Sequence, residues 1–289
     1  MRLHLLDGTY ELFRSYFGAP KRADPDGREI GAVHGIMLST LALLAEGVTH
    51  LGVAFDTVIR SFRNDLYDGY KSEAGVPADL LAQFPIAEEG LEAMGVTVWR
   101  MVEYEADDAL ASAVERFGPE FEQVVIMSPD KDLTQCIVGN RVVGFDRRKG
   151  AFIHEAGVVA KFGVPPESIP DYLGLVGDSS DGFPGVPGWG AKSASMVLGA
   201  YRHIERIPLE ASLWSPQVRG AERLVGALRE HMADALLFRF LAVLRHDVPL
   251  PQASSDDLRW RGVPRGRFED FCERYGFDSL VGRPKVWSE

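Results

Sequence analysis

The feature that most constrains the fold is an alternation, over residues 3–145, of short apolar runs with longer segments of helical periodicity. The apolar runs predict strands at residues 3–6, 50–55, 96–100, 123–127 and 142–145. The segments between them predict helices at residues 33–46, 84–94 and 105–117. Alternating strands and helices are typical of an α/β fold, in which helices cover both faces of a largely parallel sheet.

The second half of the chain has a different pattern. Residues 177–190 are dense in Gly, Pro, Asp and Ser, which favours turns. Helical patterns occur at residues 157–163, 168–176, 190–200, 220–229 and 231–244. We expect no strand after about residue 155, and the tail from 258 to 289 follows neither period clearly. The chain is therefore predicted to divide into an α/β domain at 1–165 and a helical module at 166–289.

Acidic residues follow the predicted strands directly. Asp7, Asp56, Asp130 and Asp132 each stand where a strand ends. Ligands of an open parallel sheet bind beyond the carboxyl ends of its strands, so these four side chains are expected along one edge. A single Asp at such a place often only caps a helix or starts a turn. Four acids at successive strand ends favour a functional cluster.

Two further groups of acids extend this pattern. Glu105, Asp107 and Asp108 head an Ala-rich helix, where acids also suit the helix amino terminus. Three acids in four residues repel one another unless a cation is present. Asp178 and Asp181 lie in a tight Gly/Ser turn, which is equally consistent with a simple helix stop. Carboxylate ligands without His or Cys suit Mg²⁺ or Mn²⁺, and two such ions can hydrolyse a phosphodiester.

Composition excludes several other kinds of site. Cys136 and Cys272 are the two cysteines, so neither a disulfide framework nor a thiol–metal site is expected. The sequence contains no P-loop, no Gly-x-Gly-x-x-Gly after a strand and no zinc-ligand spacing of its His residues. The first apolar run is too short for a signal peptide, and no run is long enough to span a membrane. We therefore expect a soluble cytoplasmic protein, most simply a monomer.

The net charge of −11 at first argues against nucleic acid as a partner. Most of the acidic excess lies in residues 1–169, with 26 acids and 16 bases, whereas residues 170–289 are nearly balanced. Metal ions bound by the clustered acids would invert the local field where a phosphate must sit. Charge alone thus favours an ordinary acidic protein, but the location of the charge is compatible with DNA as a partner.

A Gly-rich turn leads into the helix expected at residues 190–200. Gly188 and Gly190 expose backbone N–H groups just before Lys192 and Ser193. A helix amino terminus carries partial positive charge and receives phosphate. This arrangement is typical of a helix-hairpin-helix turn that binds the nucleic-acid backbone without reading bases.

These motifs together resemble the 5′→3′ exonuclease and flap-endonuclease family, in particular the 5′ nuclease domain of bacterial DNA polymerase I and its free-standing relatives. The resemblance runs from about residue 3 to about residue 250. Its motifs occur in family order: Leu-Leu-Asp-Gly, Ala-Phe-Asp, Ser-Phe-Arg, Gly-Tyr-Lys, Tyr-Glu-Ala-Asp-Asp, Ser-Pro-Asp-Lys-Asp-Leu and Gly-Asp-x-Ser-Asp-Gly-x-Pro-Gly-Val. It implies a Rossmann-like (PIN-like) nuclease core with a mostly parallel sheet, plus a helical helix-three-turn-helix module.

The resemblance also implies roles for matching positions. The catalytic-metal ligands would be Asp7, Asp56, Glu105, Asp107, Asp108, Asp130, Asp132, Asp178 and Asp181. Lys71 would contact the scissile phosphate and act with Asp130 and Asp132 in catalysis, while Arg63 and Tyr70 would lie at the DNA. Gly188, Gly190, Lys192 and Ser193 would bind duplex, and relatives also hold K⁺ at this turn through backbone oxygens. No polymerase region follows in this sequence, so any polymerase partner is expected as a separate chain.

One segment departs from the family pattern. Residues 72–99 contain five acids and no Lys or Arg, although relatives carry bases here that help form an arch over a single-stranded 5′ end. The aromatic residues Phe84 and Trp99 are what this segment offers for base stacking. We therefore expect weak capture of long single-stranded tails.

Three alternatives remain at the level of sequence. A related nuclease could prefer RNA or an RNA·DNA hybrid, since the acids serve either substrate. A non-catalytic structure-specific DNA-binding protein would be expected to have lost some acids, yet all nine positions are filled. A phosphatase or receiver-like fold with strand-end Asp residues would leave residues 177–194 unexplained.

Overall fold

The computed structural model describes residues 1–288 and divides into two compact units. Unit 1 comprises residues 1–61, 73–128 and the chain from 246 onward; unit 2 comprises residues 62–72 and 129–245. Among the described residues, none of the helices combines the length and apolar character needed to cross a membrane. The division of the sequence at 165/166 remains a prediction about folding domains.

Unit 1 contains a parallel sheet. Its strands are β1 (Arg2–Asp7), β2 (Leu51–Asp56), β3 (Thr97–Met101) and β4 (Gln123–Met127), in the spatial order β3-β2-β1-β4. The register pairs Leu6 with Val53 on β2, and with Met127 on β4. Near-continuous apolar runs form these strands because helices bury the sheet on both faces. The predicted α/β fold with a mostly parallel sheet is confirmed.

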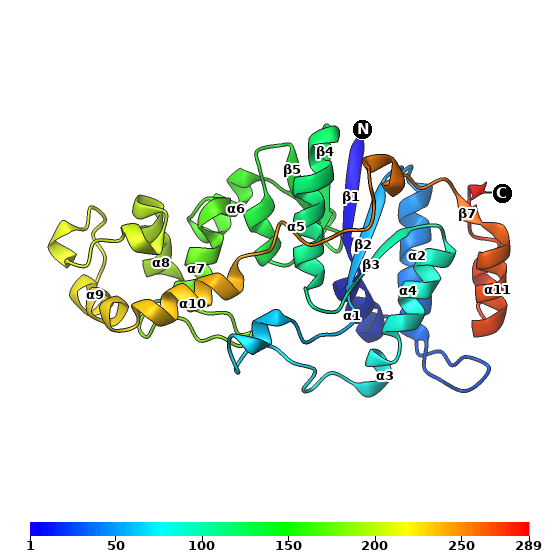
Figure 1. Ribbon diagram of the computed structural model, residues 1–289, viewed down its shortest axis with the longest axis horizontal. Helices are drawn as coiled ribbons and strands as arrows, with labels where there is room; N and C mark the ends of the chain where they lie inside the picture. Colours follow the sequence, from blue (N-terminus) through cyan, green and yellow to red (C-terminus); the bar gives the residue numbers. More distant parts are fainter. Residues whose placement is uncertain (289) are drawn as a thin grey trace. The chain divides into compact units, whose positions relative to one another are not determined.

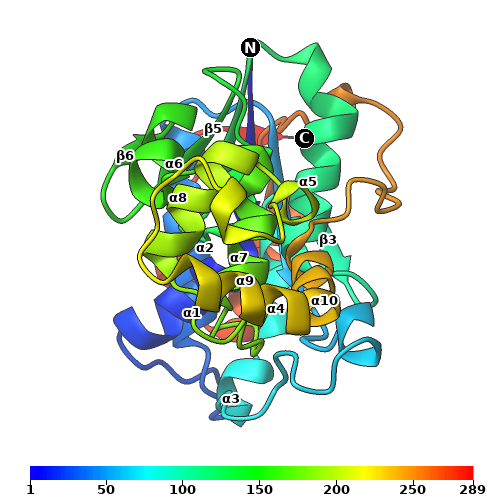
Figure 2. The same ribbon diagram turned by 90° about the vertical axis from the view of Figure 1, so that its left-hand side faces the viewer.

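The crossover helices take the faces that right-handed connections require. On one face lie α1 (Gly8–Gly18), α2 (Gly31–Ala45) and α4 (Phe84–Ala93), preceded by the single turn α3 (Ala78–Leu81). Helix α5 (Ala106–Phe117) returns the chain from β3 to β4 and covers the other face. Figures 1 and 2 show α5 and α2 on opposite sides of β1. Helix α1 was not predicted, and it starts where the Asp7 carboxylate accepts a hydrogen bond from Tyr10 N at 2.8 Å.

The C-terminal segment adds elements that the sequence pattern did not predict. Helices α11 (Arg265–Tyr275) and α12 (Asp278–Val281) follow β7 (Val263–Pro264), which pairs in parallel with β8 (Trp287–Ser288). The expectation of no strand after about residue 155 is therefore wrong, because two-residue strands are too short to show a period. In α4, Gly90 leaves room for the Phe271 ring of α11, since a Cβ there would lie 3.0 Å from it.

Unit 2 is largely helical, as predicted for the second half of the chain. A hairpin of β5 (Val142–Asp146) and β6 (Ala151–Ile153) precedes the helices, and β6 was not predicted. The helices are α6 (Glu155–Phe162), α7 (Ile169–Val176), α8 (Ala191–Tyr201), α9 (Ala221–Glu230) and α10 (Met232–Ala242). Short 3-10 turns in the two units are η1 (Phe62–Asp65), η2 (Gly118–Glu120), η3 (Asp132–Cys136), η4 (Pro166–Ser168), η5 (Ile204–Arg206), η6 (Ala211–Leu213) and η7 (Ser255–Leu258).

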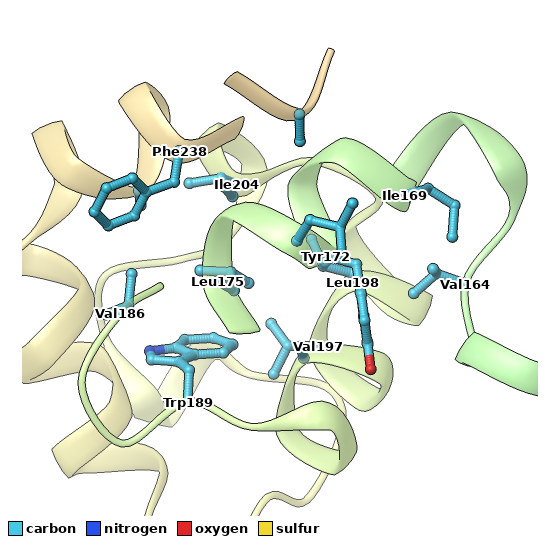
Figure 3. Close-up of a cluster of buried hydrophobic side chains, with 14 of the residues drawn as sticks. Val164, Ile169, Tyr172, Leu175, Val186, Trp189, Val197, Leu198, Ile204 and Phe238 are labelled. Atoms are coloured by element: carbon cyan, nitrogen blue, oxygen red, sulfur yellow. The ribbon is translucent and has the colours of Figure 1, made fainter. Parts of the chain in front are cut away.

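The core of unit 2 is a cluster of buried side chains from α7, α8, α10 and the turn before α8. Figure 3 shows Leu175, Trp189, Val197 and Phe238 converging in it. Helices α7 and α10 pack closely because Gly174 has no side chain: a Cβ there would lie 2.9 Å from the Ala235 carbonyl oxygen. This packing fixes the ends of α7 and α8, and the turns that follow and precede these helices carry the predicted site residues.

Candidate metal centre and nucleic-acid interface

Two strand-end acids of unit 1 lie at the carboxyl edge of its sheet, on adjacent strands. Asp7 ends β1 opposite Ala54, two residues before Asp56 on β2. The Asp7 Oδ2 atom accepts a hydrogen bond from Ser128 Oγ at 2.8 Å, just beyond β4. The Asp56 Oδ1 atom accepts one from Ala106 N at 2.7 Å, at the start of α5. Neighbouring elements thus fix the positions of both carboxylates.

The acids at the head of α5 combine two roles that the sequence left open. Glu105 is buried, and its Oε1 accepts a hydrogen bond from Ser61 Oγ at 2.7 Å. Asp108 is also buried, and its Oδ2 accepts one from Glu105 N at 3.0 Å, which completes a capping box. Helix capping therefore accounts for part of this motif, and metal binding by Glu105, Asp107 and Asp108 stays a prediction.

Unit 2 holds a compact acidic triad of Asp132, Asp178 and Asp181. One carboxylate oxygen from each lies within 4.8 Å of the others, and all three residues are buried. Asp178 pairs with Phe183 across a tight turn, with N···O distances of 2.8 and 3.1 Å. Gly182 has φ of +86° in this turn, and a Cβ there would lie 2.1 Å from the Gly69 carbonyl oxygen. The turn therefore requires a glycine at position 182, the last residue of the Gly-Asp-Ser-Ser-Asp-Gly sequence.

The electrostatics of the triad suit a cation. Burial, together with the charges of Asp130, Asp181 and Asp178, raises the pKa of Asp132 well above its usual value. Among the described residues, Asp132 Oδ1 and Asp178 Oδ2 are buried and accept no well-aligned hydrogen bond, although Lys131 Nζ forms an ion pair with Asp178 Oδ2. Buried charges are normally paired or coordinate a metal, and an all-carboxylate set suits Mg²⁺ or Mn²⁺. The residues present therefore fit a divalent ion.

Two lysines border the triad from different sides. Lys71 Nζ lies 3.4 Å from Asp181 Oδ1, and the Lys71 backbone N donates to Asp181 O at 2.9 Å. Lys131 Nζ lies 2.5 Å from Asp178 Oδ2. Burial opposes the charge of Lys131, yet Asp132 and Asp178 raise its pKa. The sequence prediction included Lys71 and missed Lys131, although its place between Asp130 and Asp132 was a usable signal.

Arg63 and Tyr70, both predicted to lie at the DNA, are buried in the structure. Arg63 is 1% exposed, and its guanidinium donates to the carbonyl oxygens of Leu241 at 2.8 Å and Val243 at 2.9 Å. Tyr70 is buried in the hydrophobic cluster of unit 2. These contacts satisfy carbonyl groups at the end of α10 and fill the core of unit 2, and contact of either side chain with DNA stays a prediction. Asn64 instead reaches Lys71, donating to its carbonyl oxygen at 2.8 Å.

The Gly-rich turn before α8 lines a cavity of about 640 Å³. Gly188, Gly190, Lys192 and Ser193 all border it, so the structure brings these four predicted residues together. Ser193 Oγ accepts from Gly190 N at 3.1 Å and caps the helix. Arg219, from the loop before α9, lines the same cavity and was missed, because no local motif marks it.

Two family models together match almost the whole chain. Residues 2–163 match the family model described as the 5′-3′ exonuclease N-terminal resolvase-like domain, and residues 164–265 match that of the 5′-3′ exonuclease C-terminal SAM fold. The chain belongs to the 5′-3′ exonuclease family. The family predicted from the motifs is confirmed, and with it membership of an enzyme family.

Curated relatives of this 5′-3′ exonuclease family member include both polymerases and a shorter protein. DNA polymerase I of Bacillus caldotenax is 33% identical over 97% of this chain and 32% of its own length. The 5′-3′ exonuclease of Aquifex aeolicus is 36% identical over 71% of each chain. The chain thus spans about a third of the length of the polymerases that it matches.

Solved structures share the fold at lower identity. The bacteriophage T5 5′-exonuclease with bound zinc ions superposes with a TM-score of 0.69 at 18% identity, covering 95% of this chain and 99% of that one. The catalytic core of Rad2 in complex with a DNA substrate gives 0.60 at 14% identity, covering 95% and 88%. At these identities the likeness establishes the fold.

Proposed function

We propose that this chain is a metal-dependent 5′ nuclease that hydrolyses phosphodiester bonds at DNA 5′ ends or flaps. The observation that carries the proposal is the buried triad of Asp132, Asp178 and Asp181, in which two carboxylate oxygens accept no well-aligned hydrogen bond among residues 1–288. Membership of the 5′-3′ exonuclease family supports the reaction class. The bacteriophage T5 flap endonuclease, in a pseudo-enzyme–product complex with DNA and metal ions, has the same fold, which supports the choice of substrate.

The acids of each unit supply ligands for divalent ions. In unit 2 these are Asp132, Asp178 and Asp181, with Asp130 accepting a hydrogen bond from Asp132 N at 2.9 Å and so positioning it. In unit 1 they are Asp7, Asp56, Glu105, Asp107 and Asp108. Bound as a pair, such ions would activate a water and stabilise the leaving oxygen of a phosphodiester. Lys71, beside Asp181, contacts the scissile phosphate and neutralises part of its charge.

Duplex DNA is held at the cavity before α8. Gly188 and Gly190 line it with Ser193, and its two cationic side chains are those of Lys192 and Arg219. These groups bind phosphate oxygens and carry no base information, so binding is independent of sequence. K⁺ held by backbone oxygens of the same turn remains part of this proposal.

The proposal is tested by cleavage of 5′-labelled substrates: a flap, a nicked duplex, a single strand and an RNA·DNA hybrid, each with Mg²⁺, Mn²⁺ or EDTA. We expect cleavage of the DNA flap or nick with a divalent ion and none in EDTA. Asp130→Ala and Asp132→Ala should each abolish cleavage with the fold retained, because an ion site needs several carboxylates.

A matched control is available in the same unit. Asp146 is also a buried acid, but its carboxylate accepts hydrogen bonds from the backbone N–H groups of Arg148 and Lys149 in the β5–β6 turn. Asp146→Asn should keep its cleavage activity. Undiminished turnover by a folded Asp130→Ala/Asp132→Ala double variant would contradict the mechanism, and preference for the hybrid would change the substrate.

A further inference from the structure

Lys131 faces the two oxygens of the triad that are available to a cation. Its Nζ lies 2.5 Å from Asp178 Oδ2 and 3.9 Å from Asp132 Oδ1. Within residues 1–288, neither oxygen receives an aligned hydrogen bond. The ammonium therefore balances charge at these oxygens without completing their hydrogen bonding, and it stands where a divalent ion would find its ligands.

The backbone of Lys131 is anchored while its side chain has a route to solvent. The Lys131 carbonyl oxygen accepts from Thr134 N at 3.0 Å and from Thr134 Oγ1 at 2.5 Å. Asp132 N is held by Asp130 Oδ1 at 2.9 Å. The Lys131 side chain is 29% exposed, and a lysine carries its charge on a flexible four-carbon stem. The ammonium can thus leave the triad without moving the acids.

A divalent ion and an ammonium cannot share these oxygens. Like charges a few ångströms apart in a buried site repel strongly, because the local dielectric is far below that of water. An ion that binds Asp132 and Asp178 must therefore displace Lys131. Its affinity is reduced by the loss of the Lys131–Asp178 ion pair, which is buried on the carboxylate side.

We propose that Lys131 is an internal counter-ion of the triad that neutralises Asp132 and Asp178 until a divalent ion displaces it toward solvent, and so weakens and gates metal binding. The inference rests on the proposed function, because the ion is the one proposed there. Lys71 differs from Lys131, since it lies beside Asp181 and is assigned to the scissile phosphate. Lys131 thus acts on the reaction indirectly, through the occupancy of the metal site.

The test is a calorimetric titration of Mn²⁺ into the full chain at fixed pH above neutral, without DNA. Lys131→Met should bind Mn²⁺ roughly tenfold or more tightly than the wild type, as expected for losing a close like charge. Lys131→Arg keeps the charge and should stay near the wild-type affinity. The control is Lys149→Met, since the exposed side chain of Lys149 pairs with the buried Asp146 carboxylate at 3.4 Å elsewhere in unit 2.

Thermal unfolding separates this role from a packing role. In EDTA, Lys131→Met should melt below the wild type, because the triad loses its counter-charge. Saturating Mn²⁺ should then raise the melting temperature of the variant by more than that of the wild type. Two outcomes would overturn this inference and leave the proposed function standing. One is an equal rise in melting temperature for variant and wild type, and the other is Mn²⁺ binding by Lys131→Met that is no tighter than that of the wild type. If the wild type binds no Mn²⁺, the proposed metal site fails and this inference fails with it.

Discussion

At the scale of single residues, Asp132 shows how a buried carboxylate of the proposed metal site behaves without a cation. Burial and the charges of Asp130, Asp181 and Asp178 raise its pKa well above the usual value. A folded chain that holds this proton more tightly than the unfolded chain is more stable at acid pH. That stability is lost as pH rises from about the unfolded pKa, near 3.9, toward the raised folded pKa.

Asp132→Asn should therefore have opposite effects on stability and on activity. In EDTA at neutral pH the variant should melt above the wild type, because the neutral amide removes the buried repulsion with Asp130, Asp181 and Asp178. Below the unfolded pKa the two proteins should melt alike. With Mg²⁺, cleavage by the variant should fall by about 100-fold or more, since even partners of metal ligands are worth 10–100-fold. Melting curves across pH measure the stability, and a flap-cleavage assay measures the activity. If Asp132→Asn were less stable than the wild type at neutral pH in EDTA, the carboxylates of the triad would not repel one another as argued here.

The residue scale also shows which parts of the site a sequence can predict. Asp7 and Asp56 could be placed because strand direction and parallel register alone put both at one sheet edge. Arg63 could not, because its Ser-Phe-Arg motif gives no sign that the guanidinium turns inward to Leu241 and Val243. Those partners lie almost 180 residues away in the chain, where no local pattern reaches.

At the scale of elements, long apolar runs and long helical periods were predictable and short or mixed segments were not. Strands β2 and β4 follow from continuous apolar runs that are almost fully buried, whereas the edge strand β3 is only partly buried, with Trp99 buried and Arg100 exposed. Helix α1 was missed because Asp7 both ends β1 and caps the helix, which leaves no linker to mark a new element. Helix α11 was missed in a tail rich in Arg and Glu, although Phe268 and Phe271 anchor it.

The turn before α8 supports a prediction about duplex binding. Lys192 and Arg219 line one cavity from two separate segments. Lys192→Ala should weaken duplex binding equally for different sequences and lower the slope of log K against log salt by about one. The Lys192→Ala/Arg219→Ala double variant should lower it by about two. Fluorescence anisotropy over a salt series measures the slope, with Lys161→Ala, an exposed lysine of α6, as control. An unchanged slope would make both residues ordinary solvated side chains.

At the scale of the whole molecule, charge limits what the chain can capture. The net charge is −11, and residues 72–99 contribute five acids and no base. The fold does not compensate with stacking surfaces, since Phe84 is 2% exposed and Trp99 is 1% exposed. Lys21 lies against the same segment, but its Nζ is 3.4 Å from Asp79 Oδ2, so that the Asp79 carboxylate balances its charge. Protein grooves that bind single strands combine basic side chains with exposed aromatic side chains, and residues 72–99 offer neither.

We therefore expect short flaps and nicks to be cut better than long single-stranded tails. The proposed contacts of duplex with Lys192 and of the scissile phosphate with the metal site do not depend on tail length. A long tail adds phosphates that face the acidic residues of segment 72–99. A flap-length series at fixed duplex should give rates that stay level or fall with tail length, and a steady rise would contradict the idea. Glu73→Lys with Ala74→Lys should raise long-flap cleavage severalfold at low salt while leaving nicks unchanged. The graft avoids Gly75, because its φ of +89° would strain any side chain placed there.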